Sequence, residues 1–277
     1  MRVLIIAPHQ DDEILAMGGL IQKCVKMNDI VTVLYATNGD YQGSEIARQR
    51  YYESINATMR LGISSNCLFY LGYGDTGMRY SHSFLRKLLL ANRNVSFATP
   101  FSNVTYHPAG KSTIHAMRTG VESPMTHESF LEDLIWFIGQ NKPDLIIIPH
   151  PSDRHGDHAA IYAFLQETDL LKRIPFCLTY VIHGGNDISW PIRETTKFTC
   201  PPVISTEIWN NRICIPLSEN EQQKKYQAIR FFDTQLNSDS TDFLLSFSKQ
   251  EEVFFLLGKN IANQQNIYNH FVCKETP

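Results

Sequence analysis

The chain has 277 residues, 43% of them hydrophobic and 19% charged, and its formal net charge of −3 gives no sign of a nucleic-acid partner or of attraction to an anionic membrane. No apolar run reaches the ~18 residues that a membrane-spanning helix needs, so no membrane span is expected. The six cysteines are scattered without a Cys-x-x-Cys pair, and we therefore expect reduced cysteines and a cytoplasmic protein.

Apolar runs alternate with helical patterns through the first part of the chain. Strands are predicted at residues 2–8, 30–36, 67–71, 144–149 and 176–182, and helices at residues 12–27, 44–61, 127–140 and 155–167. Such alternation is typical of an α/β protein. We therefore predict a Rossmann-like fold, in which a mostly parallel sheet carries helices on both faces.

Residues 79–126 interrupt this alternation. They hold one short helical stretch, at residues 84–90, within an irregular polar segment. A loop of this length inside a compact domain usually either has a function or lacks order. We therefore interpret the segment as an insertion that forms either a lid over a site or a mobile surface loop.

The chain becomes irregular again in a C-terminal extension, residues 192–277. We expect an extended piece at residues 208–215 and then a helix at residues 222–236, which starts from a capping box at residues 218–221. Apolar clusters between residues 243 and 273 are expected to pack on the main body of the protein. All 277 residues are accordingly predicted to form one domain.

An acidic cluster follows the first predicted strand. His9, Asp11, Asp12 and Glu13 lie between the apolar run at residues 3–7 and the start of the next helix. Adjacent carboxylates repel one another and resist burial unless a cation is present, and His with Asp is a common pair of zinc ligands. The cluster therefore indicates a metal site, although an Asp helix cap followed by further acids would give the same pattern.

A second cluster follows the strand predicted at residues 144–149. His155 and His158 stand at the start of the next helix, and their spacing puts both rings on one helix face. The carboxyl ends of parallel strands form a single edge of a sheet, and ligands bind there. Polar residues follow five predicted strands and are expected to converge at that edge: His9, residues 37–40, Asp75, residues 150–158 and His183.

Together the two clusters resemble the LmbE-like (PIG-L) family of metal-dependent N-acetylglucosamine deacetylases. The family motif P-H-x-D-D-E is matched at residues 8–13, and its H-x-D-H core, with an Asp two residues earlier, is matched at residues 153–158. Residues 232–235 are similar to a late helix of the family. The resemblance covers roughly residues 1–78 and 128–190.

With this resemblance, we expect His9, Asp12 and His158 to bind the metal, because three protein ligands leave a fourth position open for water. Zn²⁺ is the expected cofactor, and Fe²⁺ would tolerate the same ligands. Asp11 neighbours Asp12 but points elsewhere, and it is the expected general base.

His155 is expected to act as a protonated imidazole that stabilises the oxyanion and then protonates the leaving amine. Asp157 and Asp153 are candidates for keeping His155 charged, although either could cap the helix instead. The products would be acetate and a free amino sugar.

Six residues are candidates for substrate binding: Arg50, Asp75, Asn38, Asp153, Arg154 and His183. The family places a contact to a substrate hydroxyl at Arg50, but Arg50 could equally pair with Glu53 along its helix. Asp75 and Asn38 could bind sugar hydroxyls or close turns. Arg154 could contact an anionic group or face solvent, and His183 could reach the site or be structural.

The resemblance thus implies a zinc-dependent N-deacetylase that acts on an N-acetylglucosamine-type sugar or a small-molecule conjugate of it. Because family members are often oligomeric, it also implies a homo-oligomer. Two alternatives are a non-catalytic sugar-binding protein and a nucleotide-sugar-dependent transferase on a similar fold. The transferase is disfavoured because no G-x-G-x-x-G turn follows the first strand, where the acids would repel phosphate.

Overall fold

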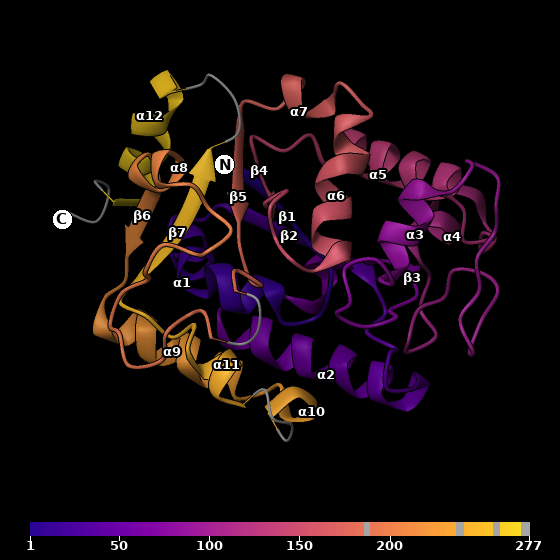
Figure 1. Ribbon diagram of the computed structural model, residues 1–277, viewed down its shortest axis with the longest axis horizontal. Coiled ribbons are helices and arrows are strands. Elements are labelled where there is room, and N and C mark those ends of the chain that lie inside the picture. The colour runs from indigo at the N-terminus through magenta and orange to yellow at the C-terminus, as the bar shows by residue number, and fades with distance from the viewer. Residues whose placement is uncertain (186–188, 237–240, 257–260, 273–277) are drawn as a thin grey trace.

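The computed structural model describes residues 1–185, 189–236, 241–256 and 261–272. Within these ranges, seven strands form one sheet in the order β3-β2-β1-β4-β5-β7-β6 (Figure 1). The strands are β1 Arg2–Ala7, β2 Ile30–Thr37, β3 Leu68–Tyr73, β4 Leu145–Pro149, β5 Phe176–Tyr180, β6 Ile213–Pro216 and β7 Glu251–Leu256. The strands β1 to β5 are parallel, and β7 is antiparallel to both β5 and β6. The predicted α/β fold with a mostly parallel sheet is confirmed.

Helices connect the parallel strands and continue into the C-terminal part. The helices of the first part are α1 Asp12–Lys26, α2 Ser44–Arg60, α3 Phe84–Leu90, α4 Ile114–Thr119, α5 His127–Asn141, α6 Gly156–Gln166 and α7 Leu170–Arg173, with a 3-10 turn at Ser65–Cys67. The later helices are α8 Thr206–Asn210, α9 Glu219–Ile229, α10 Asp233–Leu236, α11 Thr241–Leu245 and α12 Ile261–Val272. None of the described helices is long and apolar enough to cross a membrane.

Alternate side chains of the central strands pack into different cores. Val3 and Ile5 of β1 belong to one buried cluster, whereas Leu4 and Ile6 belong to the other, because successive side chains of a strand point to opposite faces. Helices α1, α2, α9 and α12 cover the first face, and α3, α5 and α6 cover the second (Figure 1). Burial on both faces explains the continuous apolar runs of these strands.

The order of the strands reverses between β1 and β4. β1 pairs with β2 on one side and with β4 on the other, both in parallel. Ligands of open α/β sheets bind outside the carboxyl ends of the strands at such a reversal. The two His/Asp clusters of the sequence follow β1 and β4, so the fold brings them to this crevice.

Part of the segment at residues 79–126 packs against the sheet. The predicted short helix is α3, and its side chains Phe84, Leu85 and Leu88 are at most 2% exposed in the second core. A second helix, α4, was not predicted, and its Ile114 is fully buried. An apolar face of α3 is thus buried against the second face of the sheet, whereas residues 92–96 are exposed.

The C-terminal extension differs from its prediction in two places. Residues 206–210 form α8, because the Ser205 side chain accepts a hydrogen bond from the Ile208 N–H and starts a helix, so only residues 213–216 are extended. The capping box at residues 218–221 is confirmed. The helix that it starts ends at Ile229, where the chain turns to bury Phe232, and α10 follows separately.

The extension also adds to the sheet and to the core. β7 and β6 extend the sheet beyond β5, and neither had been located as a strand of the sheet. Phe243, Phe254 and Phe271 belong to the first core, so the predicted packing of the apolar tail is confirmed, apart from Cys273, which lies outside the described residues.

Helix α1 bends at Met17, whose φ of −143° and ψ of 25° are not helical. The bend leaves backbone N–H groups without helical partners, and the Glu252 carboxylate of β7 accepts hydrogen bonds from the N–H groups of Gly19 and Leu20, each at 2.7 Å. The Lys225 ammonium group of α9 lies 2.7 Å from the same carboxylate, and both side chains are fully buried. This ion pair ties the extension to the helix that begins at Asp12.

Candidate metal centre

Three side chains from the ends of β1 and β4 each bring one potential metal-binding atom into a small triangle. His158 Nε2 lies 3.3 Å from His9 Nδ1, and Asp12 Oδ2 lies 3.5 Å from His9 Nδ1 and 3.4 Å from His158 Nε2. Tetrahedral ligands at about 2.0–2.1 Å from a zinc ion are about 3.3–3.4 Å apart. The residues predicted as ligands therefore fit one metal ion.

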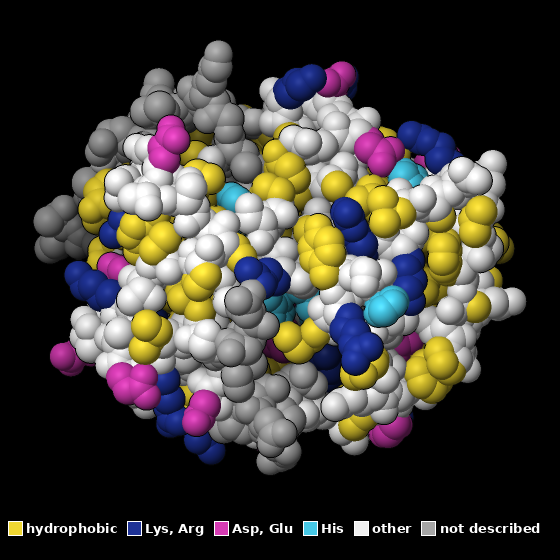
Figure 2. Space-filling view, in the orientation of Figure 1, with side chains coloured by type: hydrophobic (Ala, Val, Ile, Leu, Met, Phe, Trp, Pro, Cys, Tyr) yellow, Lys and Arg dark blue, Asp and Glu magenta, His cyan; other side chains and the backbone are white. Residues whose placement is uncertain are grey.

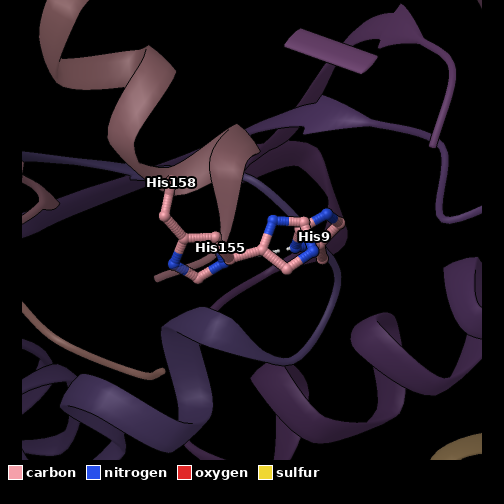
Figure 3. A group of neighbouring side chains, drawn as sticks. All are labelled: His9, His155 and His158. Atoms are coloured by element: carbon pink, nitrogen blue, oxygen red, sulfur yellow. Dashed lines mark hydrogen bonds between the residues drawn. The ribbon is translucent and has the colours of Figure 1, made fainter. Parts of the chain in front are cut away.

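A further imidazole, that of His155, adjoins this triangle. Its ring centroid lies 4.5 Å from that of His9 and 5.0 Å from that of His158 (Figure 3). Nitrogen atoms of the three rings also lie within 4.8 Å of one another, which makes His155 an alternative ligand. Its Nδ1 atom already accepts a hydrogen bond from the Asp157 N–H at 3.2 Å, as the cap of α6.

A carboxylate lies beside the second ring nitrogen of each histidine in the triangle, His9 and His158. Asp157 Oδ2 lies 3.3 Å from His9 Nε2, and Asp153 Oδ2 lies 3.3 Å from His158 Nδ1. Such carboxylates orient histidine ligands and make them more basic. Their placement corrects the expectation that they pair with His155, whose Nδ1 atom is 3.9 Å from the Asp157 carboxylate.

The surroundings of His155 favour its neutral form. Burial, reinforced by the neighbouring His9 and His158, lowers the pKa of His155 well below its usual value of 6.5. Because its Nδ1 atom accepts the Asp157 N–H, a neutral His155 carries its proton on Nε2. The structure therefore does not support the protonated imidazole expected from the sequence.

Asp153 was also a candidate for substrate binding, but its carboxylate is engaged inside the protein. Oδ2 accepts hydrogen bonds from the N–H groups of Ile182 and His183, at 2.8 and 3.1 Å, and Oδ1 accepts one from the His155 N–H at 2.9 Å. Asp153 therefore joins the end of β5 to the start of α6 and orients His158.

Asp11 stands beside the triangle in a strained conformation. Its φ of 143° and ψ of −32° are costly for a residue with a side chain, and such strain is often found at functional sites. Burial raises the pKa of Asp11 to about 7, against the opposing effect of Arg50. The Glu13 carboxylate accepts hydrogen bonds from the Asp11 N–H at 3.2 Å and from the Tyr35 hydroxyl at 2.8 Å, so it supports the helix start.

The charges around the triangle favour a cation. Burial opposes protonation of His9, but Asp12 and Asp157 outweigh burial and raise the pKa of His9 well above 6.5. The pKa of His158 is raised in the same way by Asp12 and Asp153, again against burial. The donor set, its spacing and this excess of acids all fit a divalent metal.

The triangle opens into a cavity of about 230 Å³. Histidine atoms lie at the floor of a hollow on the face shown in Figure 2. The polar side chains of the wall are those of His9, Asp11, Asp12, Gln42, Arg50, Asp75, His155, His183 and Gln235. Its larger apolar side chains are those of Leu15, Tyr41, Met78, Ile182, Phe243 and Leu244.

Three of the substrate-binding candidates line this cavity: Arg50, Asp75 and His183. A terminal nitrogen of Arg50 donates to the Gln10 carbonyl at 3.0 Å and to Asp11 at 3.3 Å. The alternative helical pair with Glu53 is absent, because the Glu53 carboxylate accepts hydrogen bonds from the N–H and hydroxyl of Thr234, at 2.8 and 2.6 Å.

Two other candidates are not part of the cavity wall. Asn38 is buried, and its amide nitrogen donates to the carbonyls of Gly72 and Tyr106, so it closes loops. Arg154 is exposed and lines a separate hollow together with Tyr80. Asn38 thus matches the alternative of closing turns, and Arg154 matches the alternative of facing solvent.

Several wall residues had not been singled out as site residues, among them Tyr41, Gln42, Met78, Gln235, Phe243 and Leu244. Tyr41 and Gln42 directly follow the loop at residues 37–40, and Met78 follows Asp75, so their place after a strand was a usable signal. Gln235 lies in the stretch similar to a late helix of the family. No local sequence pattern indicated that Phe243 and Leu244 would line the cavity.

Comparison with known families agrees with this geometry. The model of the PIG-L family, described as GlcNAc-PI de-N-acetylase, matches residues 4–168, which is more than half of the chain. The chain therefore belongs to the PIG-L family, as the two motifs indicated.

Individual relatives are distant. A glucosamine-6-phosphate deaminase-like protein of Bacteroides thetaiotaomicron is 22% identical over 86% of this chain and 36% of its own length. The diacetylchitobiose deacetylase of Thermococcus kodakarensis is 28% identical over 44% of this chain and 48% of its own length. The chain thus spans about a third to a half of the length of these curated relatives.

A solved structure shows the same fold. That of the A40926 pseudoaglycone deacetylase superposes with a TM-score of 0.57, at 16% identity, over 92% of this chain and 96% of that chain.

Proposed function

We propose that this chain is a metal-dependent hydrolase that removes the N-acetyl group from an N-acetylglucosamine-type amino sugar or its conjugate and releases acetate. The observation that carries the proposal is the triangle of His9 Nδ1, Asp12 Oδ2 and His158 Nε2, with sides of 3.3–3.5 Å, at the floor of a cavity that Asp11 also lines. Membership of the PIG-L family supports the type of reaction and the class of substrate.

His9, Asp12 and His158 would hold the metal. Zn²⁺ is the proposed ion, and Fe²⁺ is the alternative because imidazole and carboxylate ligands suit both. When bound, a divalent cation supplies Lewis acidity, which makes water more acidic and polarises a carbonyl group.

Asp11 is proposed as the group that moves the proton. It accepts a proton from the attacking water as the new oxygen–carbon bond forms at the amide carbon. It then returns this proton to the nitrogen as the carbon–nitrogen bond breaks, so that acetate and a free amine result. The contact between Arg50 and Asp11, at 3.3 Å, holds the carboxylate in the cavity during both transfers.

His155 is proposed to bind the carbonyl oxygen of the amide. Its neutral ring would donate a hydrogen bond from Nε2 and stabilise the negative charge that develops on this oxygen. This role replaces proton donation by a charged His155, because its Nδ1 atom is occupied by the Asp157 N–H. Arg50 and Asp75 in the same wall offer a donor and an acceptor for sugar hydroxyl groups.

The proposal is tested with purified protein loaded separately with Zn²⁺ and Fe²⁺. Acetate, free amine and ammonia are measured after incubation with N-acetylglucosamine, diacetylchitobiose and N-acetylglucosamine conjugates. We expect equal amounts of acetate and amine, loss of both after chelation and recovery on adding metal back. Ammonia without acetate would indicate a deaminase instead, and sugar binding without either product would indicate a sugar-binding protein.

Two further sequence-based predictions form part of the proposal. A cytoplasmic location is supported by the cysteines Cys24, Cys67, Cys177, Cys200 and Cys214, which are free. A homo-oligomer is proposed because members of the family are often oligomeric. Cell fractionation tests the first, and light scattering after gel filtration tests the second.

A further inference from the structure

Two large apolar side chains stand exposed at the mouth of the cavity. Tyr41 is 64% exposed and Met78 is 59% exposed, and both belong to the cavity wall together with Asp75 and Arg50. Single exposed apolar residues are normal on a protein surface, whereas apolar residues gathered at a binding site usually contact a ligand. We call Tyr41 and Met78 the apolar rim.

The apolar rim comes from two loops that touch. Tyr41 follows β2, and Met78 follows β3. Gly77 has a φ of +85°, and a Cβ atom added there would lie only 2.9–3.1 Å from three ring atoms of Tyr41. The Tyr41 ring therefore rests directly on the backbone beside Met78, and the positive φ of Gly77 favours glycine at this position.

Hydrogen bonds fix these two loops to each other. The Asp40 carboxylate accepts one from the Asp75 N–H at 2.6 Å and another from the Tyr106 hydroxyl at 2.7 Å. The Asp75 carboxylate in turn accepts one from the Gly77 N–H at 2.7 Å. A binding surface that is already ordered loses little conformational entropy when a ligand arrives. The exposed rim is thus held in place before a ligand binds.

The position of the rim indicates what it would contact. Asp75 lies between the rim and the triangle, with Oδ2 4.0 Å from His9 Nε2. A sugar whose amide reaches the triangle would place its hydroxyl groups near Asp75 and Arg50, and a group attached to the sugar would extend to the rim. The neighbouring wall residues Gln42 and Gly77 carry no charge.

We propose that the apolar rim is a subsite for an apolar substituent on the amino sugar, so that the preferred substrate is an N-acetylated glycoside with an alkyl or aryl group. This inference rests on the proposed function, since it assumes that the amide is cleaved at the triangle. It narrows the substrate class from any conjugate to an amphiphilic one.

The test compares methyl and hexyl N-acetylglucosaminides. In the unaltered protein we expect kcat/KM for acetate release to be about tenfold higher for the hexyl glycoside, because part of its chain leaves water at the rim. Calorimetry of both glycosides with the same protein measures binding independently of turnover, and a more negative heat-capacity change is expected for the hexyl glycoside.

Met78→Gln and Met59→Gln form a matched pair of variants. Met59 of α2 is 58% exposed, almost as much as Met78, and lies outside the cavity wall. Met78→Gln is expected to lower the hexyl-to-methyl ratio of kcat/KM about threefold, whereas Met59→Gln should leave this ratio at the value of the unaltered protein.

The outcomes distinguish failure of the apolar subsite from failure of the proposed deacetylase function. A hexyl-to-methyl ratio near one in the unaltered protein, or equal ratios in the two variants, would overturn the apolar subsite while acetate release upholds the proposed function. If neither glycoside releases acetate, the proposed function fails. The calorimetric ratio of affinities, compared between the two variants, then decides whether the rim binds the apolar group.

Discussion

The cavity has two unlike walls, which come from different parts of the chain. The wall that precedes residue 159 carries the charged side chains of the cavity beside the triangle of His9, Asp12 and His158, whose sides measure 3.3–3.5 Å, and it also carries the apolar rim. The wall from the C-terminal extension carries Gln235, Phe243 and Leu244, which are an amide and two apolar side chains. Catalysis depends on sub-ångström placement of reacting groups, whereas apolar contact is non-directional. The charged side chains of the first wall should therefore govern turnover, and the second wall, like the apolar rim, should govern how well the substrate fits.

The largest effect in the first wall is expected for Asp12→Ala. This change removes one corner of the triangle, so we expect loss of stoichiometric metal and complete loss of acetate release. Elemental analysis and the acetate assay measure both effects. Asp169→Ala, at an exposed position away from the cavity, serves as the control. Full metal content in Asp12→Ala would contradict the ligand assignment.

Asp11→Asn separates proton transfer from metal binding in the same wall. The amide cannot take a proton from water, so kcat should fall by about 10²–10⁴-fold, while the metal content should stay stoichiometric. Rapid kinetics with N-acetylglucosamine glycosides and elemental analysis provide the two readouts. Turnover within a few-fold of the unaltered protein would refute the role of Asp11.

Lys225→Met tests how the extension supports the first wall. The change leaves the buried Glu252 carboxylate without its cation, and breaking such a pair costs about 3–5 kcal/mol of the free energy of unfolding. Urea unfolding followed by circular dichroism measures this loss. Lys224→Met, at a partly exposed position next in sequence, is the matched control.

Glu252→Gln combined with Lys225→Met removes both charges and should recover part of the lost stability. If Lys225→Met were no less stable than Lys224→Met, the ion pair would not hold β7 against α1.

The smallest effect is expected for Phe243→Leu in the second wall. The Phe243 ring stacks on that of His183, with 5.6 Å between the ring centroids, and its centroid lies 5.3 Å from that of Phe247. A smaller apolar side chain should change KM about two- to fivefold and leave kcat nearly the same, because no reacting group moves. Steady-state kinetics measures this split.

Phe247→Leu controls for lost packing, since it lies in the same cluster but outside the cavity wall. Both variants should lose less than about 1.5 kcal/mol of stability. A kcat that fell in Phe243→Leu alone would show that the second wall also positions the reacting groups.

The elements of the first part could be predicted closely because their patterns are strong. The apolar runs of β1 and β4 contain no competing signal, and their helices follow at once. The extension was harder to predict. β7 carries two acids at its start, and Glu252 can be buried only because Lys225 and two N–H groups of α1 meet it. A strand whose stability depends on residues so distant in sequence leaves little local trace.

The amino-acid sequence alone determined the strand ends, the donor types and the two motifs, because a strand that ends in acids and histidines leaves a local pattern. Only the tertiary structure decided which groups face each other. It pairs Asp157 with His9 and Asp153 with His158, lowers the pKa of His155 by burying it, and brings Phe243 to the cavity. These contacts depend on how helices and loops pack across the sheet, and residue spacing along the chain does not encode that packing.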